Sequence, residues 1–271
     1  MAPAVQRHSQ AGGDFGERSI PVHRADGPGT RTGVLGAFCG SDAGNMHIDL
    51  TCQPSYTMAY VRLSHGENVV CESGALVAMS AGIESDVSTG GGVAAALVRK
   101  VAGQESFFMG RYRALTEGAW VALAPKFPGD INVVDLVDGR DLIVQTGSLL
   151  GHADGVETSM RFGGIGTVIQ REGLAVMLAK GVGQLLICSY GGLQRFEIGP
   201  GEHIVVDTGH LVAWSAGMGL RIGPLSGVVA ASVSGEGLVA ELTGPGEVYV
   251  QTRSESSLRS WIIPSREQNA R

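Results

Sequence analysis

The sequence has few aromatic residues, few charged residues and no apolar run long enough to cross a membrane. Aromatic residues make up 6% of the chain and charged residues 17%, whereas hydrophobic residues make up 44%, which is a globular composition. The most apolar stretch, residues 173–188, is broken by glycines and contains Lys180 and Gln184. We therefore predict a globular protein without a transmembrane helix.

Paired cysteines and an excess of basic charge are also missing. The four cysteines, Cys39, Cys52, Cys71 and Cys188, form no CxxC pair, which disfavours a metal or redox site and is typical of reduced thiols in the cytoplasm. The net charge of −6 makes nucleic acid an unlikely partner, since polyanion binding requires clustered basic residues. We expect a cytoplasmic protein with neither a metal nor another cofactor.

The first 45 residues show neither helical nor strand periodicity, so they cannot bury enough apolar surface to offset the entropy of ordering. They lack the apolar core of a secretory signal, and their acidic residues argue against a transit peptide. We predict a disordered N-terminal extension over 1–45, a single compact β domain over 46–253 and a C-terminal tail over 254–271. Whether the extension belongs to the native protein, or translation starts at Met46, stays open.

Glycine is abundant, with 42 residues, and it marks an internal repeat. Residues 66–83 (GENVVCESGALVAMSAGI) and 201–218 (GEHIVVDTGHLVAWSAGM) are identical at ten of eighteen positions, and a weaker copy lies at 139–157. In each copy a strand-like run leads through a tight glycine turn to a second apolar run, which is the pattern of a β-hairpin. The sequence therefore predicts an all-β protein of three tandem modules, with hairpin cores near 59–84, 131–157 and 193–219.

The second run of each copy is apolar on both faces, as Val69 and Cys71 on one face and Val70 on the other illustrate. Such strands must be covered on both faces, so we expect them inside a sheet or at interfaces between repeats or subunits. Each run ends in a polar residue, a hydroxyl residue and a glycine that is expected to adopt a positive φ. Further strands are predicted at 111–115, 119–123, 183–189, 238–242 and 247–252, and a single helix at 92–101.

Several separated motifs stand in a fixed order between Met46 and about Arg253: GENVVCESGALVAMSAGIE, GGG…RK…ESFF, LAPKFPGD, VDTGHLVAW and SGEGLVAELTGPGEVYVQTR. This order resembles the altered inheritance of mitochondria 24 family, including its bacterial members; one departure is Gln104, where the family pattern has a second glycine. The resemblance implies a pseudo-threefold repeat of β-sandwich or short double-stranded β-helix modules like the tryptophan RNA-binding attenuation protein (TRAP). It also implies a eukaryotic branch linked to mitochondrial inner-membrane organisation, and it implies no reaction.

Three repeat-equivalent polar residues form the first candidate site. Glu72, Gln145 and Asp207 each end the second run of a copy, and pseudo-threefold packing would bring them near one axis as a site for a cation or a polar ligand. The simpler interpretation is that each side chain hydrogen-bonds the turn that follows it.

A second candidate is an anion-contact loop. Gly90, Gly91 and Gly92 open the predicted helix, and Arg99 and Lys100 follow within it, an arrangement that can attract a phosphate or a headgroup. The loop lacks the GK[ST] ending of a P-loop, so a solvated basic loop is the simpler interpretation.

Recognisable catalytic and metal-binding patterns are missing from the sequence. His152, His203 and His210 show neither HxH nor HExxH spacing, and no GxSxG elbow is present. We therefore predict no catalytic, cofactor-binding or metal-binding residue.

These observations favour a non-catalytic, oligomeric β scaffold or interaction protein. Association with a membrane-linked assembly, through peripheral membrane contact, is a further hypothesis, and the protein partners are unknown. The alternative is a small-ligand or RNA-binding module of TRAP-like type, which rests on fold analogy alone. An enzyme is the third hypothesis, because residues distant in sequence can converge in space. A homo-oligomer is expected, since exposed edge strands tend to pair with other subunits.

Overall fold

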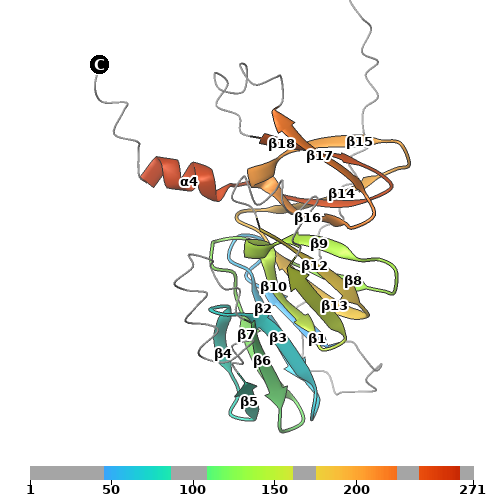
Figure 1. Cartoon of the computed structure of the whole chain (residues 1–271). Helices are drawn as coiled ribbons and strands as arrows, with labels where there is room; N and C mark the ends of the chain where they lie inside the picture. The colour runs from blue at the N-terminus through green and yellow to red at the C-terminus, as the bar shows by residue number, and fades with distance from the viewer. Residues whose placement is uncertain (1–45, 87–108, 161–174, 225–237, 263–271) are drawn as a thin grey trace, which may run out of the picture. The chain divides into compact units, whose positions relative to one another are not determined.

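The computed structural model describes residues 46–86, 109–160, 175–224 and 238–262. These residues form strands β1 to β19 and one α-helix, α4, so the all-β prediction is confirmed (Figure 1). The predicted anion-contact loop, with Gly90, Gly91, Gly92, Arg99 and Lys100, and the predicted helix 92–101 lie outside the described residues.

Eighteen of the described strands fall into three successive modules of six, which we call the first, second and third module. The first module contains β2 (Met58–Leu63), β3 (Asn68–Glu72), β4 (Leu76–Met79), β5 (Ile83–Asp86), β6 (Met109–Ala114) and β7 (Ala119–Leu123). The second contains β8 (Ile131–Leu136), β9 (Leu142–Gln145), β10 (Leu149–Ala153), β11 (Val156–Met160), β12 (Val176–Gly181) and β13 (Gly183–Cys188). The third contains β14 (Leu193–Ile198), β15 (His203–Asp207), β16 (Leu211–Ser215), β17 (Gly219–Pro224), β18 (Leu238–Thr243) and β19 (Gly246–Gln251). Strand β1 (His47–Thr51) precedes the first module and pairs with β2.

The strand pairing is the same in all three modules. If the six strands of a module are labelled a to f in chain order, a, f and c form one sheet in the order a-f-c, and d, e and b form the other in the order d-e-b. All these pairs are antiparallel. Both sheets of the first module contribute side chains to one apolar core, so the module is a small β-sandwich.

Neighbouring modules are joined through a shared sheet. Strand b of one module pairs with strand c of the next, as β3 does with β10 and β9 with β16, and each pairing fuses two three-stranded sheets into a six-stranded one. We call these two pairings the internal junctions. Strand c carries a bulge directly after its first residue in every module, at Leu76, Leu149 and Leu211. The bulge is therefore a fixed part of the module.

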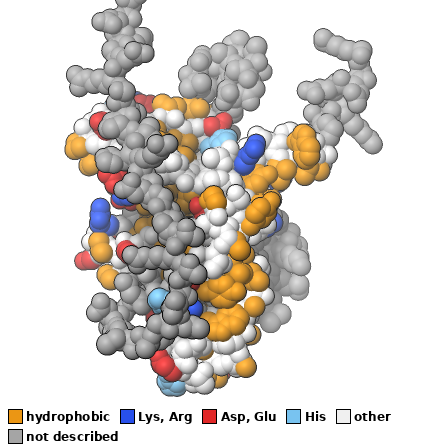
Figure 2. Space-filling view, turned by 180° about the vertical axis from the view of Figure 1, so that it is seen from behind, with side chains coloured by type: hydrophobic (Ala, Val, Ile, Leu, Met, Phe, Trp, Pro, Cys, Tyr) orange, Lys and Arg blue, Asp and Glu red, His pale blue; other side chains and the backbone are white. Residues whose placement is uncertain are grey.

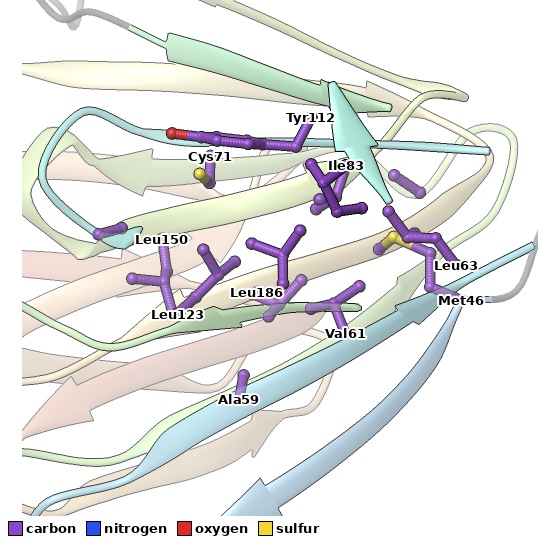
Figure 3. Packing of buried hydrophobic residues seen from close by; sticks show 14 of the residues in the cluster. Met46, Ala59, Val61, Leu63, Cys71, Ile83, Tyr112, Leu123, Leu150 and Leu186 are labelled. Atoms are coloured by element: carbon purple, nitrogen blue, oxygen red, sulfur yellow. The ribbon is translucent and has the colours of Figure 1, made fainter. Parts of the chain in front are cut away.

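The junctions also merge the cores. Leu150 of β10 and Leu186 of β13 belong to the second module, yet they pack into the core of the first module beside Val61 and Leu123 (Figure 3). In the same way Val212 of the third module packs into the core of the second. The central strands of the shared sheets, such as β3 and β10, are thus buried on both faces, which accounts for their two-sided apolar sequences.

The positive φ angles predicted for the repeated glycines occur at some of the expected positions and not at others. Gly66, Gly139 and Gly201, in the turn between strands a and b, all have a positive φ, as the repeated hairpin pattern requires. The positive φ expected at the end of strand b occurs at Gly74. It does not occur at Gly147 or Gly209, because those glycines lie in short 3₁₀ turns, η1 (Thr146–Ser148) and η2 (Thr208–His210).

Helix α4 (Glu255–Ile262) lies within the predicted C-terminal tail, where no helix was expected. Ser254 caps it: the Ser257 N–H donates to Ser254 Oγ at 3.3 Å, and the Leu258 N–H donates to the Ser254 carbonyl at 3.2 Å. Within the described residues no helix has the length and apolar character needed to cross a membrane.

Candidate functional site

The three polar residues predicted as a cluster end strand b of the three modules. Glu72 ends β3, Gln145 ends β9 and Asp207 ends β15, and these strands belong to three different sheets. Within the described part of the chain, no hydrogen bond or ion pair joins two of these three side chains. They occupy equivalent places in successive modules, and a site formed by all three stays a prediction.

The simpler interpretation, a side chain that bonds its own turn, is confirmed for Asp207. The Gly209 N–H donates to Asp207 Oδ1 at 2.7 Å and so closes the turn η2. Gln145 makes no such capping bond at η1. In the first module it is the backbone carbonyl of Glu72 that accepts, from the Ala75 N–H at 3.1 Å. The side chain of Glu72 therefore remains available for other interactions.

The start of α4 lies against the turns of the second and third modules. A Cβ atom at Gly209 would lie 3.2 Å from Ser254 Cβ, and one at Gly147 would lie 3.6 Å from Glu255 Oε1. The preceding residue Gln251 fixes this path, because its Nε2 donates to the Gly209 carbonyl at 3.0 Å. The C-terminal segment thus connects turns that are far apart in sequence.

Glu72 is the most perturbed carboxyl group among these turns. Burial raises its pKa to about 7, the positive charge of Lys126 opposes this rise, and the negative charge of Glu255 adds to it. Near neutral pH the group can therefore gain or lose a proton. Sequence reasoning selected Glu72 but missed Lys126 and Glu255, because nothing in their local patterns shows that they converge on β3.

The chemistry around Glu72 does not include a reactive thiol. Burial, with a further contribution from the charge of Glu72, raises the pKa of Cys71 to about 12 and that of Cys188 to about 12. A thiol with such a pKa is almost entirely protonated at neutral pH and is a poor nucleophile. Both cysteines pack in the core of the first module, as their apolar sequence context indicates.

The three histidines considered as candidate ligands, His152, His203 and His210, lie apart and each has a local partner. His152 is buried at the first internal junction, where burial lowers its pKa and its Nδ1 lies 2.9 Å from the Ala153 carbonyl oxygen. His203 Nδ1 lies 2.9 Å from Thr243 Oγ1, and His210 Nδ1 lies 2.8 Å from the Gln251 carbonyl oxygen. Over the described ranges, no three His, Cys, Asp or Glu side chains are grouped so that they could hold a metal ion.

Exposed apolar side chains form the other notable feature. They gather in patches on the face seen in Figure 2, and several belong to strand ends, turns and helix α4. Two strands at the edges of their sheets, β4 and β15, expose large apolar side chains: Val77 and the terminal Met79 on β4, and Val205 in the middle of β15. Of the two places expected for strand b, the interior of a sheet therefore does not apply to β15, since Val205 is open to solvent in the single chain, and an interface between subunits stays a prediction.

Comparison with known proteins relates this geometry to a family. A family model described as "Mitochondrial biogenesis AIM24" matches residues 48–253. An uncharacterised protein of Streptococcus pyogenes serotype M6 is 27% identical over 214 residues, which cover 76% of this chain and 84% of that protein. The crystal structure of a protein from Streptococcus pyogenes is similar with a TM-score of 0.67 and 25% identity, over 80% of this chain and 98% of that one. The family match therefore spans all three modules.

Proposed function

The chain belongs to the mitochondrial biogenesis AIM24 family, and from this premise we propose that it works as a non-catalytic β scaffold that associates with copies of itself and with protein partners. One observation carries the proposal. Among the described strands, β4 and β15 each have one edge without a hydrogen-bonded neighbour, although the equivalent strands of the other modules are paired on both edges and buried. Open apolar edges of this kind favour association with another chain.

The chemistry of the described residues supports the non-catalytic part of the proposal. The carboxyl group with the most perturbed pKa, Glu72, lies near two thiols that burial keeps protonated, and the three histidines lie at separate places. General acid–base or nucleophilic catalysis requires such groups to meet around one reacting atom. The net charge of −6 likewise gives no support to an RNA-binding role.

Helix α4 supports a link to a membrane surface as a further part of this proposal. Leu258, Trp261 and Ile262 follow helical spacing on one side, and Trp261 and Ile262 are exposed. A short helix with an exposed tryptophan suits the interface between headgroups and acyl chains. Sedimentation of the full chain with anionic vesicles tests this part.

In that experiment we expect the wild-type chain to sediment with the vesicles and the double variant Trp261→Ala/Ile262→Ser to stay in solution. Tyr56→Ala is a matched control, since it removes an exposed aromatic side chain elsewhere on the molecule. Wild-type protein that stays in the supernatant would remove the membrane part and leave the scaffold proposal standing.

Native mass spectrometry of the full chain, purified from its own host under gentle conditions, tests the scaffold proposal. We expect a mass that is a multiple of 28.1 kDa without a bound small molecule. A monomer, or a stoichiometric extra mass, contradicts the proposal; in the second case the identity of the extra mass would point to a ligand-binding module.

A further inference from the structure

We infer that copies of the chain associate head to tail, with strand β4 of one copy paired antiparallel to strand β15 of the next. The inference rests on the proposed self-association and names its surfaces and its register. Its basis is that the chain already contains two examples of the same pairing, the internal junctions β3–β10 and β9–β16. Among the described strands, none pairs with the free edge of strand c in the first module or with that of strand b in the third.

Other strands also lie at sheet edges, but the repeat distinguishes them from β4 and β15. Strand d is an edge strand in all three modules, as β5, β11 and β17. Strand a is an edge strand in the second and third modules, and β1 covers it in the first. An open edge is therefore the normal state of strands a and d. Only strands b and c have partners at the internal junctions and lack them at the two ends of the described array.

Burial shows what strand b loses at the end of the array. Val70 and Ile143 occupy the centre of strand b in the first and second modules and are 8% and 6% exposed. The equivalent Val205 of β15 is 53% exposed. The same side-chain position is therefore buried wherever a strand c lies beside it and open where none does.

Strand c shows the complementary loss. His152 and Trp214, which lie opposite Val70 and Ile143 at the junctions, are 5% and 1% exposed. The equivalent Met79 of β4 is 40% exposed. Pairing of β4 with β15 would place Met79 opposite Val205 and cover both apolar side chains at once.

A second position on β4 supports the same partner. Leu150 and Val212 follow the first leucine of strand c, and each packs into the core of the preceding module. No described module precedes the equivalent Val77, which is 55% exposed. In the proposed contact, Val77 would pack against the core of the third module of another copy, as Leu150 and Val212 pack into the core of the preceding module.

The composition of β4 agrees with its use as an interface. Proteins protect open edges with charged residues, proline or bulges that prevent pairing with another chain. The permanently open edges β5, β8, β11, β14 and β17 each carry at least one charged residue in mid-strand or at a strand end. Strand β4, with the sequence LVAM, carries none. Its edge therefore has no electrostatic protection, and its bulge does not prevent pairing, because β10 and β16 have the same bulge and are paired at the internal junctions.

The internal junctions also define the register. They pair Gly151, His152 and Ala153 with Cys71, Val70 and Val69, and they pair Ala213, Trp214 and Ser215 with Val144, Ile143 and Leu142. The same register between copies pairs Ala78 with Val206, Met79 with Val205 and Ser80 with Ile204. Because the two surfaces differ, this contact is heterologous and leads to a closed ring or an open filament.

Two aspartate variants test the arrangement. Met79→Asp blocks the β4 edge and leaves β15 intact, whereas Val205→Asp blocks β15 and leaves β4 intact; each would bury an unpaired charge at the contact. We expect each variant alone to be a folded monomer. An equal mixture should form a heterodimer and nothing larger, through the one intact edge of each partner. Val182→Asp, at an exposed valine on neither edge, should assemble like the wild type.

Cysteine cross-linking tests the register. In a background of Cys39→Ser and Cys52→Ser, the pair Met79→Cys and Val205→Cys should form a covalent ladder on oxidation, because directly opposed residues lie within disulfide range. Met79→Cys combined with Val137→Cys is the matched control, with an exposed valine away from both edges, and it should not cross-link.

The outcomes separate this inference from the scaffold proposal. A wild-type chain that is monomeric contradicts both. An oligomer that survives both aspartate substitutions, or one that only a single substitution disrupts, as symmetric pairing of β4 with β4 would require, overturns the head-to-tail contact and leaves self-association intact. Mixed variants that stay monomeric, while the wild type assembles, also overturn it.

Discussion

At the scale of single residues, the most informative group is the carboxyl group of Glu72. Its side chain ends β3 near Lys126 and Glu255, and its pKa of about 7 lies well above the ordinary value of 4.5 because it is buried. A group with a raised pKa in the folded state binds more protons there than in the unfolded state. Between pH 4.5 and 7 it therefore makes the free energy of unfolding decrease as the pH rises.

Substitution of Glu72 by Gln should remove this dependence. At pH 8 we expect Glu72→Gln to be more stable than the wild type by about 1–2 kcal/mol, a range discounted for solvent screening of a partly exposed group. At pH 4 the two proteins should be about equally stable, since the carboxyl group is then protonated in both states. Denaturant unfolding at a series of pH values measures this difference. A variant that is less stable than the wild type at pH 8 would show that the electrostatic attraction of Lys126 outweighs the effect of burial.

His152 makes the free energy of unfolding depend on pH with the opposite sign, and Glu72→Gln does not remove this dependence. Burial lowers its pKa below the ordinary 6.5, so the unfolded chain binds more protons than the folded one below that pH. The free energy of unfolding should therefore decrease as the pH falls below 6.5.

Glycine 129 allows a second prediction at this scale. A Cβ atom at Gly129 would lie 1.7 Å from the Ser189 carbonyl oxygen, in a segment where Gly129 and Gly191 form an isolated β-bridge. Gly129→Ala must therefore displace backbone, and we expect a loss of about 1–3 kcal/mol in the free energy of unfolding. Gly217→Ala is the matched control, since a Cβ there meets nothing within 4 Å. Equal stability of the two variants in a thermal melt would contradict this account.

At the scale of elements, the equivalence of strand c in the three modules can be measured with one residue type. Val212 of β16 is fully buried in the core of the second module, whereas the equivalent Val77 of β4 is exposed. In dilute solution we expect Val212→Ala to cost about 2 kcal/mol, from lost burial and a small cavity, and Val77→Ala to cost less than about 0.5 kcal/mol. Denaturant unfolding of both variants checks this.

If Val77→Ala costs as much as Val212→Ala in dilute solution, then Val77 is already packed within its own chain and a second copy is not needed to cover it. That result would weaken the case for β4 as an interface.

Individual strands were predictable from sequence where the local pattern is strong. The strand expected at 119–123 coincides with β7, and the strands expected at 183–189 and 238–242 differ from β13 and β18 by one residue each. Their alternation and the flanking glycine turns contain the information needed. Helix α4 was missed because its sequence ESSLRSWI is rich in serine and has only three apolar residues to mark a face.

The candidate site was predictable only in part. The repeat led to Glu72, Gln145 and Asp207, because equivalent residues share a position in the module. It could not show that Glu255 and Lys126 approach Glu72, because such contacts depend on how distant segments pack. The repeat also made Val205 equivalent to the buried Val70 and Ile143, although Val205 is 53% exposed and no described strand c pairs with β15.

At the scale of the whole molecule, the described residues form an array of three modules with one rule for joining neighbours. Strand b of each module pairs with strand c of the next. Among the described strands this leaves one strand b, β15, and one strand c, β4, without such a partner. In the proposed head-to-tail assembly the same rule applies between copies, so the number of modules in one chain would not limit the size of the assembly.

Hydrogen exchange of the wild-type full chain, compared between dilute and concentrated solution, tests this central claim most directly. We expect the amide groups of β4 (Leu76–Met79) and β15 (His203–Asp207) to become protected together as the concentration rises, while β5 and β11 stay unchanged. Protection that appears on neither strand, on only one of them, or first on β5 and β11 would contradict head-to-tail association.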